Sequence, residues 1–499
     1  MIGIDEMATF CKKKGFVFPS SEIYGGFAGF WDYGPLGAEL KKNIKDAWWK
    51  FHVHQREDVV GIDGSIITHP KVWEASGHVA SFQDLMLECS KCNFKIKAES
   101  YIEEKAKIAA DGMKAPEMNK IIEHHKLVCE KCKAPFKELE EFNLMFKTFV
   151  GSKTDSESTA YLRPETAQLM FVDFKQVVET ARLQLPFGIA QIGRAFRNEI
   201  APRNFLFRCR EFEQMEIEYF IHPKDTNNCP FVDEILEHEM IVFSEEMQKS
   251  GEKLGKKMSM KQALAQKIIK TQWHAYWLAT AHSWFTSLGA NPENFRIRQH
   301  VQTEKSHYAL DTWDLEYKFP FGWKELQGIA NRTDFDLKQH MQYSKKDLSL
   351  FIQEDKQKIV PYVVAEPSQG VDRAFLVFMF DAYVDDKERG NIVLKLNPKI
   401  APYKAAIFPL VSKEGLPEKA REVYCMLKPH LNVFYDKSGS IGRRYARQDE
   451  IGTPYCITID FDSLKDNSVT IRDRDTTKQE RIPIPQLTEK LQQLATQNI

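Results

Sequence analysis

Two arginines, a glutamate and a phenylalanine near the middle of the chain have the types and spacing of a nucleotide site. Arg197 and Glu199 share one short segment, and Arg208 and Phe212 follow in the next. Two guanidinium groups can hold a triphosphate bidentately, a carboxylate can accept a hydrogen bond from an adenine amino group, and an aromatic ring can stack on the base. These residues therefore predict nucleotide binding on a sheet. The alternative is a salt-bridged sheet face without a ligand.

Two strand-like runs would carry these residues. Residues 188–199 and 208–220 are joined by a loop that contains Pro202, which predicts a long antiparallel hairpin. No Gly-rich phosphate loop of the strand–GxxxxGK–helix type occurs, which disfavours a P-loop fold. Period-two alternation gives the second strand a polar face, Arg208, Arg210, Phe212, Gln214, Glu216 and Glu218, and an apolar face, Met215, Ile217 and Tyr219.

Two Cys-x-x-Cys pairs form the second chemical signal. Cys89, Cys92, Cys129 and Cys132 supply four thiolates, which suit a tetrahedral Zn²⁺ site. The 36 residues between the pairs exceed the usual spacing of about 15–20, so the pairs would close around an extended insertion. A structural zinc is favoured over free or redox thiols. A catalytic zinc is disfavoured, because four sulfur ligands leave no open position.

Helices and strands must position these groups. A helix is predicted from Pro35, because apolar residues recur there at helical spacing, and this apolar stripe needs a partner. A β-rich stretch follows at residues 59–68, residues 93–128 are mostly helical in composition, and another helix is predicted from Pro164. The stripe of the first helix is Leu36, Leu40, Ile44, Ala47 and Trp48, and the core face of the helix from Pro164 is Ala167, Met170, Phe171, Phe174, Val177 and Val178.

The second half of the chain divides at Pro398. Residues 225–300 read as a helical insertion whose aromatic stripe is interpreted as core rather than as a stacking platform. After Pro398, alternating strands and helices predict a separate α/β domain of about a hundred residues. The aromatic stripe is Trp273, Tyr276, Trp277 and Trp284; the strands after Pro398 are expected at 405–411, 433–435 and 453–461, with a helix at 418–427.

Composition excludes several classes of protein. A length of 499 residues predicts about three domains, and 43% hydrophobic residues exclude a chain that is mainly disordered. The 69 basic and 70 acidic residues nearly cancel, so any nucleic-acid contact must come from local patches. The sequence contains no run of some 18 apolar residues, so no membrane span is predicted. An odd count of nine cysteines and a start without basic or apolar leader regions favour a cytoplasmic, reducing location.

The hairpin residues resemble the second motif of class II aminoacyl-tRNA synthetases, which is Arg-x-Glu, a variable loop and Arg-x-x-x-Phe. The third motif of that family is similar to Gly370-Val371-Asp372-Arg373 and the apolar run after it. The helix from Pro35 and the strand ending at Pro70 resemble the first motif, which in the family forms a homodimer interface. The resemblance implies a fold of the α+β class: an antiparallel sheet flanked by helices, with inserted subdomains and a C-terminal α/β anticodon-binding domain.

Within the class, the chain most closely resembles the homodimeric glycyl-tRNA synthetases over nearly its whole length. The markers, in family order, are Trp73–His78, Arg163–Gln168, Phe212–Glu216, Glu325–Arg332 and Glu366–Gly370. The expected division is 1–88 as the N-terminal part of the catalytic domain with motif 1, 89–150 as an insertion with zinc knuckles, 151–224 as catalytic core with motif 2, 225–300 as the helical insertion, 301–398 as catalytic core with motif 3, and 399–499 as the anticodon-binding domain.

The resemblance implies a function and a set of roles. The chain would activate glycine with ATP to glycyl-adenylate, release pyrophosphate, and transfer glycine to the 3′ end of tRNA(Gly). Mg²⁺ would bridge phosphate oxygens. The implied catalytic residues are Arg197, Arg208, Arg373 and Glu325, the last as a metal ligand; the ATP-binding residues are these four with Asn198, Glu199, Phe207, Phe212, Leu326 and Gly370; and the glycine-binding residues are Glu165, Phe212, Gln214, Glu216, Arg332, Glu366, Ser368 and Gly370.

Some features stay open. Lys97 occupies a position where the family often has an arginine, so its contact with glycine is in question. Arg443, Arg444 and Arg447 could meet RNA phosphates or could be a solvated charge run. Two other functions compete: a nucleic-acid-binding relative without catalysis, like the accessory subunit of a mitochondrial DNA polymerase, and an adenylate-forming enzyme that loads a carrier protein or makes a dinucleotide such as diadenosine tetraphosphate.

Overall fold

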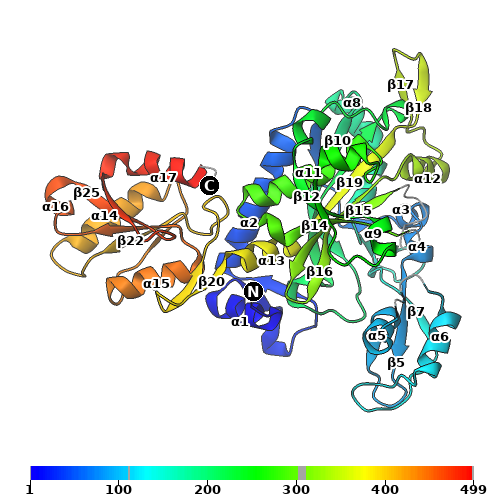
Figure 1. Cartoon of the computed structure of the whole chain (residues 1–499), viewed down its shortest axis with the longest axis horizontal. Helices are drawn as coiled ribbons and strands as arrows, with labels where there is room; N and C mark the ends of the chain where they lie inside the picture. Colours follow the sequence, from blue (N-terminus) through cyan, green and yellow to red (C-terminus); the bar gives the residue numbers. More distant parts are fainter. Residues whose placement is uncertain (1, 109, 111–112, 302–310, 497–499) are drawn as a thin grey trace.

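The protein is described here by a computed structural model that covers residues 2–108, 110, 113–301 and 311–496. Within them, a nine-stranded sheet has the order β13-β12-β14-β15-β16-β19-β11-β10-β3 (Figure 1). Most neighbours are antiparallel, whereas β3 with β10 and β12 with β14 are parallel. The predicted helix-flanked sheet is confirmed, as a mixed sheet. Its strands are β3 Val59–Ile62, β10 Phe187–Phe196, β11 Glu211–Ile221, β12 Glu239–Phe243, β13 Lys256–Ser259, β14 Phe295–Gln299, β15 Thr312–Phe319, β16 Gly322–Ala330 and β19 Tyr362–Gly370.

Strands β10 and β11 form the predicted hairpin and pair along the whole length of β10. Their inner ends are shorter than predicted, because Arg197, Glu199 and Arg208 lie in the connection rather than on the strands. Pro202 in that connection has no N–H to donate to a ladder. The backbone N–H of Arg197 still donates to the carbonyl of Arg210 at 2.9 Å, which closes the loop. The connection therefore holds the arginines at the open end of the sheet.

Helix α2 (Pro35–Trp49) packs against α13 (Val371–Ala382). The predicted helix from Pro35 is confirmed, and Leu36, Leu40 and Ile44 are buried in the main core. Within the chain, the stripe finds a partner in α13, which belongs to the same core.

One lysine of α2 ties the three motif segments together. The Nζ atom of Lys41 lies 3.2 Å from Oε2 of Glu213 on β11 and 3.1 Å from Oδ1 of Asp372 on α13. Asp372 also accepts hydrogen bonds from the hydroxyl of Tyr33 and, at 2.8 Å, from the backbone N–H of Glu213. Hydrogen-bonded charges of this kind hold a geometry more firmly than neutral pairs. The start of α13 is thereby fixed against the hairpin.

The helix predicted from Pro164 begins three residues later, as α7 (Ala167–Val172) followed by α8 (Phe174–Ala181). Thr166 precedes α7, but its hydroxyl donates to the Glu216 carboxylate on β11 rather than capping the helix. A tertiary hydrogen bond has replaced the local one. Pro164 and Glu165 thus lie in the connection between β9 and α7, outside any helix or strand.

Residues 225–300 are only partly the helical insertion that the sequence predicts. They contain α9 (Glu245–Lys249), α10 (Met260–Ala265) and α11 (Gln272–Ser287), yet β12, β13 and β14 extend the main sheet. These strands have only four or five residues each, too few for alternation to be recognised. The prediction that the aromatic stripe is core is confirmed: Trp273, Tyr276, Trp277 and Trp284 are all buried.

The segment with the cysteine pairs forms a small unit beside the main sheet (Figure 1). It has a three-stranded sheet of order β6-β5-β7, two helices and its own small core. The predicted helical content between the pairs is confirmed. The elements are β5 Gln83–Glu88, β6 Lys95–Lys97, α5 Ala98–Ala106, α6 Ala115–His124 and β7 Glu140–Asn143.

Smaller elements complete the part before Pro398. They flank the main sheet or join its strands. They are α1 Ile4–Lys14, β1 Val17–Pro19, β2 Trp31–Tyr33, β4 Ile67–Thr68, α3 Pro70–Ala75, α4 His78–Ser81, β8 Lys147–Phe149, β9 Thr159–Leu162, α12 Phe335–Ser344, β17 Leu350–Ile352, β18 Gln357–Ile359, β20 Tyr383–Asp386 and β21 Asn391–Leu394. No helix among the described residues combines the length and the apolar character needed to cross a membrane.

The C-terminal domain has the predicted α/β pattern. Its five-stranded sheet, of order β23-β22-β24-β25-β26, has a hydrophobic core separate from that of the main sheet. Figure 1 places this domain to one side of the rest of the chain. Its elements are β22 Ala405–Pro409, α14 Leu416–Leu427, β23 Val433–Tyr435, α15 Ile441–Ile451, β24 Tyr455–Ile459, α16 Ser463–Asp466, β25 Ser468–Asp473, β26 Gln479–Pro483 and α17 Leu487–Thr496.

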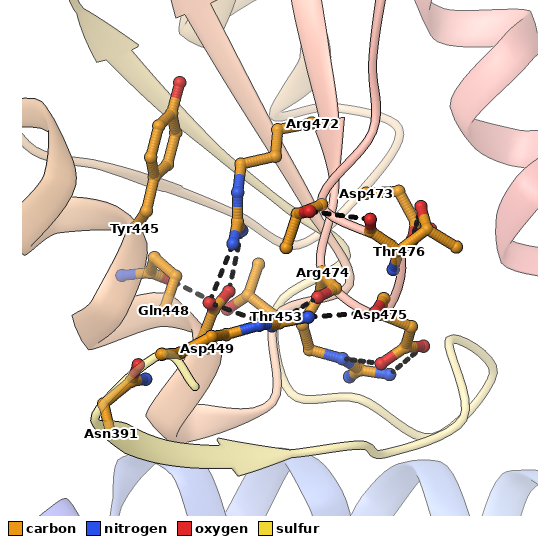
Figure 2. Close-up of polar contacts among 12 residues, drawn as sticks. Asn391, Tyr445, Gln448, Asp449, Thr453, Arg472, Asp473, Arg474, Asp475 and Thr476 are labelled. Atoms are coloured by element: carbon orange, nitrogen blue, oxygen red, sulfur yellow. Dashed lines mark hydrogen bonds and ion pairs between the residues drawn. The ribbon is translucent and has the colours of Figure 1, made fainter. Parts of the chain in front are cut away.

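Polar contacts attach this domain to the hairpin β20–β21 that follows α13. Within the domain, Arg472 on β25 forms a bidentate pair with Asp449 on α15, with N···O distances of 2.8 and 2.9 Å (Figure 2). Arg389, in the β20–β21 turn, donates to the carbonyls of Arg474 and Asp475 at 2.7 and 2.9 Å. Planar guanidinium groups suit such multiple contacts. The two parts are therefore joined by specific hydrogen bonds as well as by the connecting chain.

Candidate functional site

One cavity, of about 370 Å³, lies where β11, β16 and β19 meet the start of α13. This volume is in the range of small-molecule sites. The cavity is lined by every residue that the sequence predicts for ATP or glycine binding except Asn198, whose backbone N–H instead donates to the Leu144 carbonyl at 2.8 Å. The predicted residues that line it are Glu165, Arg197, Glu199, Phe207, Arg208, Phe212, Gln214, Glu216, Glu325, Leu326, Arg332, Glu366, Ser368, Gly370 and Arg373.

Arg197 is held in position at the open end of the hairpin. Its Nε atom donates to the carbonyl of Pro164 at 3.1 Å, and its guanidinium carbon lies 5.4 Å from the ring centroids of both Phe82 and Phe212. Stacking between two aromatic rings restricts a guanidinium without consuming its charge. Arg197 can therefore present a fixed positive charge to an anion in the cavity.

Arg373 and Glu325 form the opposite wall. Nη1 of Arg373 lies 2.9 Å from the carbonyl oxygen and 3.4 Å from the Oε1 atom of Glu325. The Arg373 guanidinium carbon stacks 4.5 Å from the centroid of Phe207. Arg208 is more open, with its Nε atom 3.7 Å from Oε2 of Glu199. We name Arg197, Arg208, Arg373 and Glu325 the triphosphate end of the cavity.

The pKa of Glu325 responds to these cations. Burial opposes ionisation of its carboxyl, but the positive charges of Arg373, His300 and Arg197 outweigh burial and lower the pKa. Glu325 is therefore a carboxylate at neutral pH. Carboxylate oxygens are the protein ligands that Mg²⁺ prefers.

Two further lining residues, His300 and Asp314, were missed by sequence reasoning. Nε2 of His300 lies 2.8 Å from Oδ2 of Asp314, and both face the cavity. Burial, with the nearby Glu325 carboxylate, raises the pKa of Asp314 to about 6 despite the hydrogen bond to His300. Neither residue belongs to a motif with a recognisable spacing. The alternation of charged residues along β15 was the only sequence pattern that could have indicated Asp314 as a site residue.

The other end of the cavity is acidic. Three glutamates converge there: Glu165 from the segment before α7, Glu216 from β11 and Glu366 from β19. Ser368 joins them, and its hydroxyl accepts a hydrogen bond from Nε2 of Gln214 at 3.1 Å. Several carboxyl groups around one small space favour a cation. We name Glu165, Glu216, Glu366 and Ser368 the glycine pocket, because their predicted ligand is the glycine ammonium.

The charge states of the three glutamates differ. Burial opposes ionisation of Glu165, but the His78 ring, 3.2 Å away, and the Arg332 guanidinium lower its pKa. Burial raises the pKa of Glu366 to about 8, and Glu216 and Glu165 add to the effect against the opposing pull of Arg332. Burial and the Glu165 carboxylate also raise the pKa of Glu216. The three glutamates therefore differ in ionisation: Glu165 is a carboxylate at neutral pH, whereas Glu216 and Glu366 hold their protons more tightly.

Arg332 lines the cavity and is also engaged by protein side chains. Its Nε and Nη2 atoms each donate to the Asp336 carboxyl group at 2.7 Å, and Nη1 donates to both Glu366 oxygens at 2.9 and 3.0 Å. The guanidinium is buried. These contacts orient Glu366.

A buried arginine fixes the segment that carries Glu165. Nε of Arg163 donates to the carbonyl of Arg194 at 2.6 Å, and Nη1 donates to that of Gly64 at 2.8 Å. A Cβ atom at Gly193 would lie 2.0 Å from Nη2 of Arg163, so only glycine leaves room for this guanidinium. The sequence Arg163-Pro164-Glu165 is thereby anchored across β10.

The four cysteines of the two pairs come together. The Sγ atoms of Cys89 and Cys132 lie 3.3 Å apart, those of Cys92 and Cys129 lie 3.6 Å apart, and all four lie within 4.8 Å of one another. Zn–S bonds of about 2.3 Å in a tetrahedron require S···S separations of about 3.8 Å. The donor set and its dimensions therefore fit Zn²⁺.

Two other predicted features are placed elsewhere. Lys97 pairs with Asp84 at 2.8 Å and with Glu99 at 2.9 Å, and it does not line the main cavity. Arg444 is buried and donates to backbone carbonyls, including that of Pro409 at 2.6 Å, so it is not a solvated RNA contact.

Comparisons with known proteins agree with this site. The family described as "tRNA synthetase class II core domain (G, H, P, S and T)" matches residues 146–381, and "Anticodon binding domain" matches residues 404–494. Among solved structures, a prolyl-tRNA synthetase from Cryptosporidium parvum has a TM-score of 0.59 at 15% identity and covers 98% of this chain and 75% of its own. That likeness concerns the fold alone.

Curated relatives match almost end to end. A glycine–tRNA ligase of Caldanaerobacter subterraneus subsp. tengcongensis is 47% identical over 99% of this chain and 98% of its own length. One of Geobacillus thermodenitrificans is 46% identical over 97% of this chain and 96% of its own. With the class II core, the anticodon-binding domain and a cavity that joins arginines to a glutamate cluster, the chain belongs to the glycine–tRNA ligase family of class II aminoacyl-tRNA synthetases.

Proposed function

We propose that the cavity activates glycine by joining it to ATP, with the residue roles that follow. The observation that carries the assignment is the meeting of two opposite charge clusters, the triphosphate end and the glycine pocket, in one cavity. The arginines would hold the phosphates of ATP, and the glutamates would hold the ammonium of glycine. The carboxylate of glycine then lies between them, facing the α-phosphate.

Arg197 would contact the α-phosphate and stabilise the charge that develops as the glycine carboxylate attacks it. Arg208 and Arg373 would hold the γ-phosphate end. Pyrophosphate leaves and glycyl-adenylate forms, so catalysis rests on positioning and electrostatic stabilisation, with no covalent enzyme intermediate. The adenylate then passes its acyl group to the 3′-hydroxyl of the tRNA.

The adenine ring would lie between aromatic and cationic surfaces. Phe212 offers one face, and Arg373, stacked on Phe207, offers the other. Glu199 would accept from the adenine amino group. Mg²⁺, when bound, would offset phosphate charge, and Glu325 is its proposed ligand, with the Asp314 carboxylate close by.

Selectivity for glycine would come from the walls of the pocket. A substrate without a side chain is recognised by its charges, and a wall at the Cβ position rejects alanine by steric overlap. The test is ATP–pyrophosphate exchange with each of the twenty amino acids. Exchange with glycine alone supports the assignment, and exchange with another amino acid, or with none, would contradict it.

We also propose that the four cysteines bind a structural zinc ion that joins the ends of the inserted unit. We expect about one zinc per chain in freshly purified protein by elemental analysis. Replacing Cys92 with serine should abolish the zinc and make residues 89–132 sensitive to protease. Replacing Cys425, which is exposed and lies in the other domain, is the matched control. Freshly purified protein without stoichiometric zinc would contradict the proposal.

The homodimer through motif 1 remains a proposal, and we propose that the exposed segment before α2 extends its interface. Ile23, Tyr24 and Phe27 are 87%, 88% and 78% exposed, an unusual density of large apolar side chains on a surface. We expect sedimentation of the full chain to give twice its 57.9 kDa mass. Changing both Tyr24 and Phe27 to aspartate should give monomers, whereas the same change at exposed Phe351 should not. If the unsubstituted chain sediments as a monomer, this proposal is contradicted.

tRNA is the macromolecular partner of the family, and the C-terminal domain is its anticodon-binding part. Arg443 and Arg447 are exposed on α15 and are the proposed phosphate contacts there. All nine cysteines are free of disulfides, which supports a cytoplasmic location. Dinucleotide synthesis remains a proposed side reaction, because an adenylate in an open cavity can also be attacked by a second ATP.

A further inference from the structure

A fourth glutamate, Glu218, lies directly behind the glycine pocket. It is on the same face of β11 as Glu216, two residues further along, and is completely buried. Glu216 pairs with Ser368 and Tyr219 pairs with Ala365, so Glu218 stands opposite Glu366 on β19. The carboxyl groups of Glu216, Glu218 and Glu366 have oxygens within 4.8 Å of one another. Glu218 itself does not line the cavity.

Neither carboxyl oxygen of Glu218 has a hydrogen-bond partner among the described residues. A buried ionised carboxylate without a partner costs several kcal/mol. The charged groups that face Glu218 are Glu216 on its own strand, Glu366 on β19, Arg332 after β16 and Asp336 on α12. Arg332 is already paired with Glu366 and Asp336. An ionised Glu218 would therefore face three other carboxyl groups, those of Glu216, Glu366 and Asp336, and one engaged cation.

Protonation of Glu218 removes this repulsion between carboxyl groups. Burial raises the pKa of Glu218 well above its ordinary value, and the neighbouring Glu366 adds to the effect. A protonated carboxyl has one O–H donor, and the nearby acceptors are the oxygens of Glu216 and Glu366. A hydrogen bond from a neutral acid to a carboxylate is charge-assisted and short.

We propose that Glu218 is a positioning residue of the glycine pocket: it keeps its proton and donates it in a hydrogen bond to the adjoining Glu216 and Glu366 carboxyl groups, which holds them toward the glycine ammonium. This inference rests on the proposed glycine pocket. It gives an acidic residue that touches no substrate a role in substrate affinity. It also explains why a carboxyl, rather than an apolar side chain, occupies a completely buried position.

Two substitutions separate the possible roles of Glu218. Glu218→Gln keeps the shape and a donor but cannot ionise, whereas Glu218→Leu keeps most of the volume and has no donor. In glycine-dependent pyrophosphate exchange, we expect the Glu218→Gln variant to have a glycine KM within about threefold of that of the unsubstituted chain. Leu should raise it roughly tenfold to a hundredfold, the range for losing one hydrogen bond to a charged group. The KM for ATP should stay unchanged in both.

Two control substitutions show the effect expected for a direct glycine contact and for a buried polar group outside the pocket. Glu216→Gln removes a proposed ammonium contact and should raise the glycine KM strongly. Gln369→Leu removes another completely buried polar group, on β19 but on the opposite face from Glu366, and should leave the glycine KM unchanged. If neither Gln nor Leu at position 218 changes the glycine KM, Glu218 only fills space and the inference is overturned. If both raise it equally, Glu218 is an ionised ligand and the inference is also overturned.

Infrared spectroscopy tests the proton directly and does not depend on the folding of the leucine variant. We expect the absorption of a protonated, buried carboxyl in the unchanged chain and its loss in Glu218→Gln. An unchanged chain without that absorption would overturn the inference. Failure of glycine exchange in the unchanged chain would instead contradict the proposed function, so the two failures are distinguishable.

Discussion

Replacing Arg197 with alanine should lower the kcat of glycine-dependent pyrophosphate exchange by about 10²–10³-fold, the usual cost of removing one preorganised group that stabilises developing charge. Arg197 is held by the Pro164 carbonyl and by the rings of Phe82 and Phe212 before any substrate binds. Its contribution therefore needs no reorganisation during the reaction. The glycine KM should change much less than kcat, because the ammonium is held at the other end of the cavity.

Arg194→Ala is the matched control for this prediction. Arg194 lies three residues earlier, its side chain is 62% exposed, and it pairs with Glu211 on the surface of the hairpin. Its loss should change kcat by less than about twofold, since exposed ion pairs contribute little. Arg197→Lys should retain part of the activity, because an ammonium keeps the charge but not the planar, bidentate geometry. Equal losses at positions 194 and 197 would contradict the proposed role of Arg197.

Replacing Glu165 with alanine should abolish glycine-dependent exchange, with a fall in kcat/KM for glycine of at least about a hundredfold. Its pKa is lowered by His78 and Arg332 in spite of burial, so it is a carboxylate at neutral pH. Removing it takes away the carboxylate that lies 3.2 Å from Nε2 of His78 and one of the charges proposed for the ammonium. Losing a buried, charge-assisted contact has a large effect on binding.

ATP binding should survive in Glu165→Ala, because the triphosphate end lies on other elements. Calorimetric titration with ATP in the absence of glycine measures this separately from exchange. Glu179→Ala, a change on the exposed side of α8, is the control and should leave both properties unchanged. Unaltered exchange kinetics in Glu165→Ala would refute the glycine pocket.

Much of the site could be predicted because its residues lie in short, continuous motifs. Arg197 and Arg208 flank one loop, Arg373 opens α13, and the residue types themselves indicate anion binding. The hairpin was predictable because its strands, of 10 and 11 residues, are long enough for alternation to be recognised. The C-terminal α/β pattern was predictable because short apolar runs alternate there with helical patterns.

Other features were decided between segments distant in the sequence. The partner of the α2 stripe is α13, which lies more than 300 residues further along the sequence, and no local sequence pattern indicates this contact. The strands β12 to β14 are short and gain their place from the sheet that they extend. The contacts of Arg332 with Asp336 and Glu366 join three separate segments and were not part of the prediction. His300 and Asp314 line the cavity although neither belongs to a recognisable sequence motif.

The sequence by itself determined the chemistry of this protein, because residue type sets which groups can bind a triphosphate, an ammonium or a zinc ion. It also determined the order of motifs along the chain. Only the tertiary structure decided which charges meet. Burial and neighbouring charges set the ionisation of Glu165, Glu366 and Glu218, and both depend on contacts between strands that the chain brings together only when it folds.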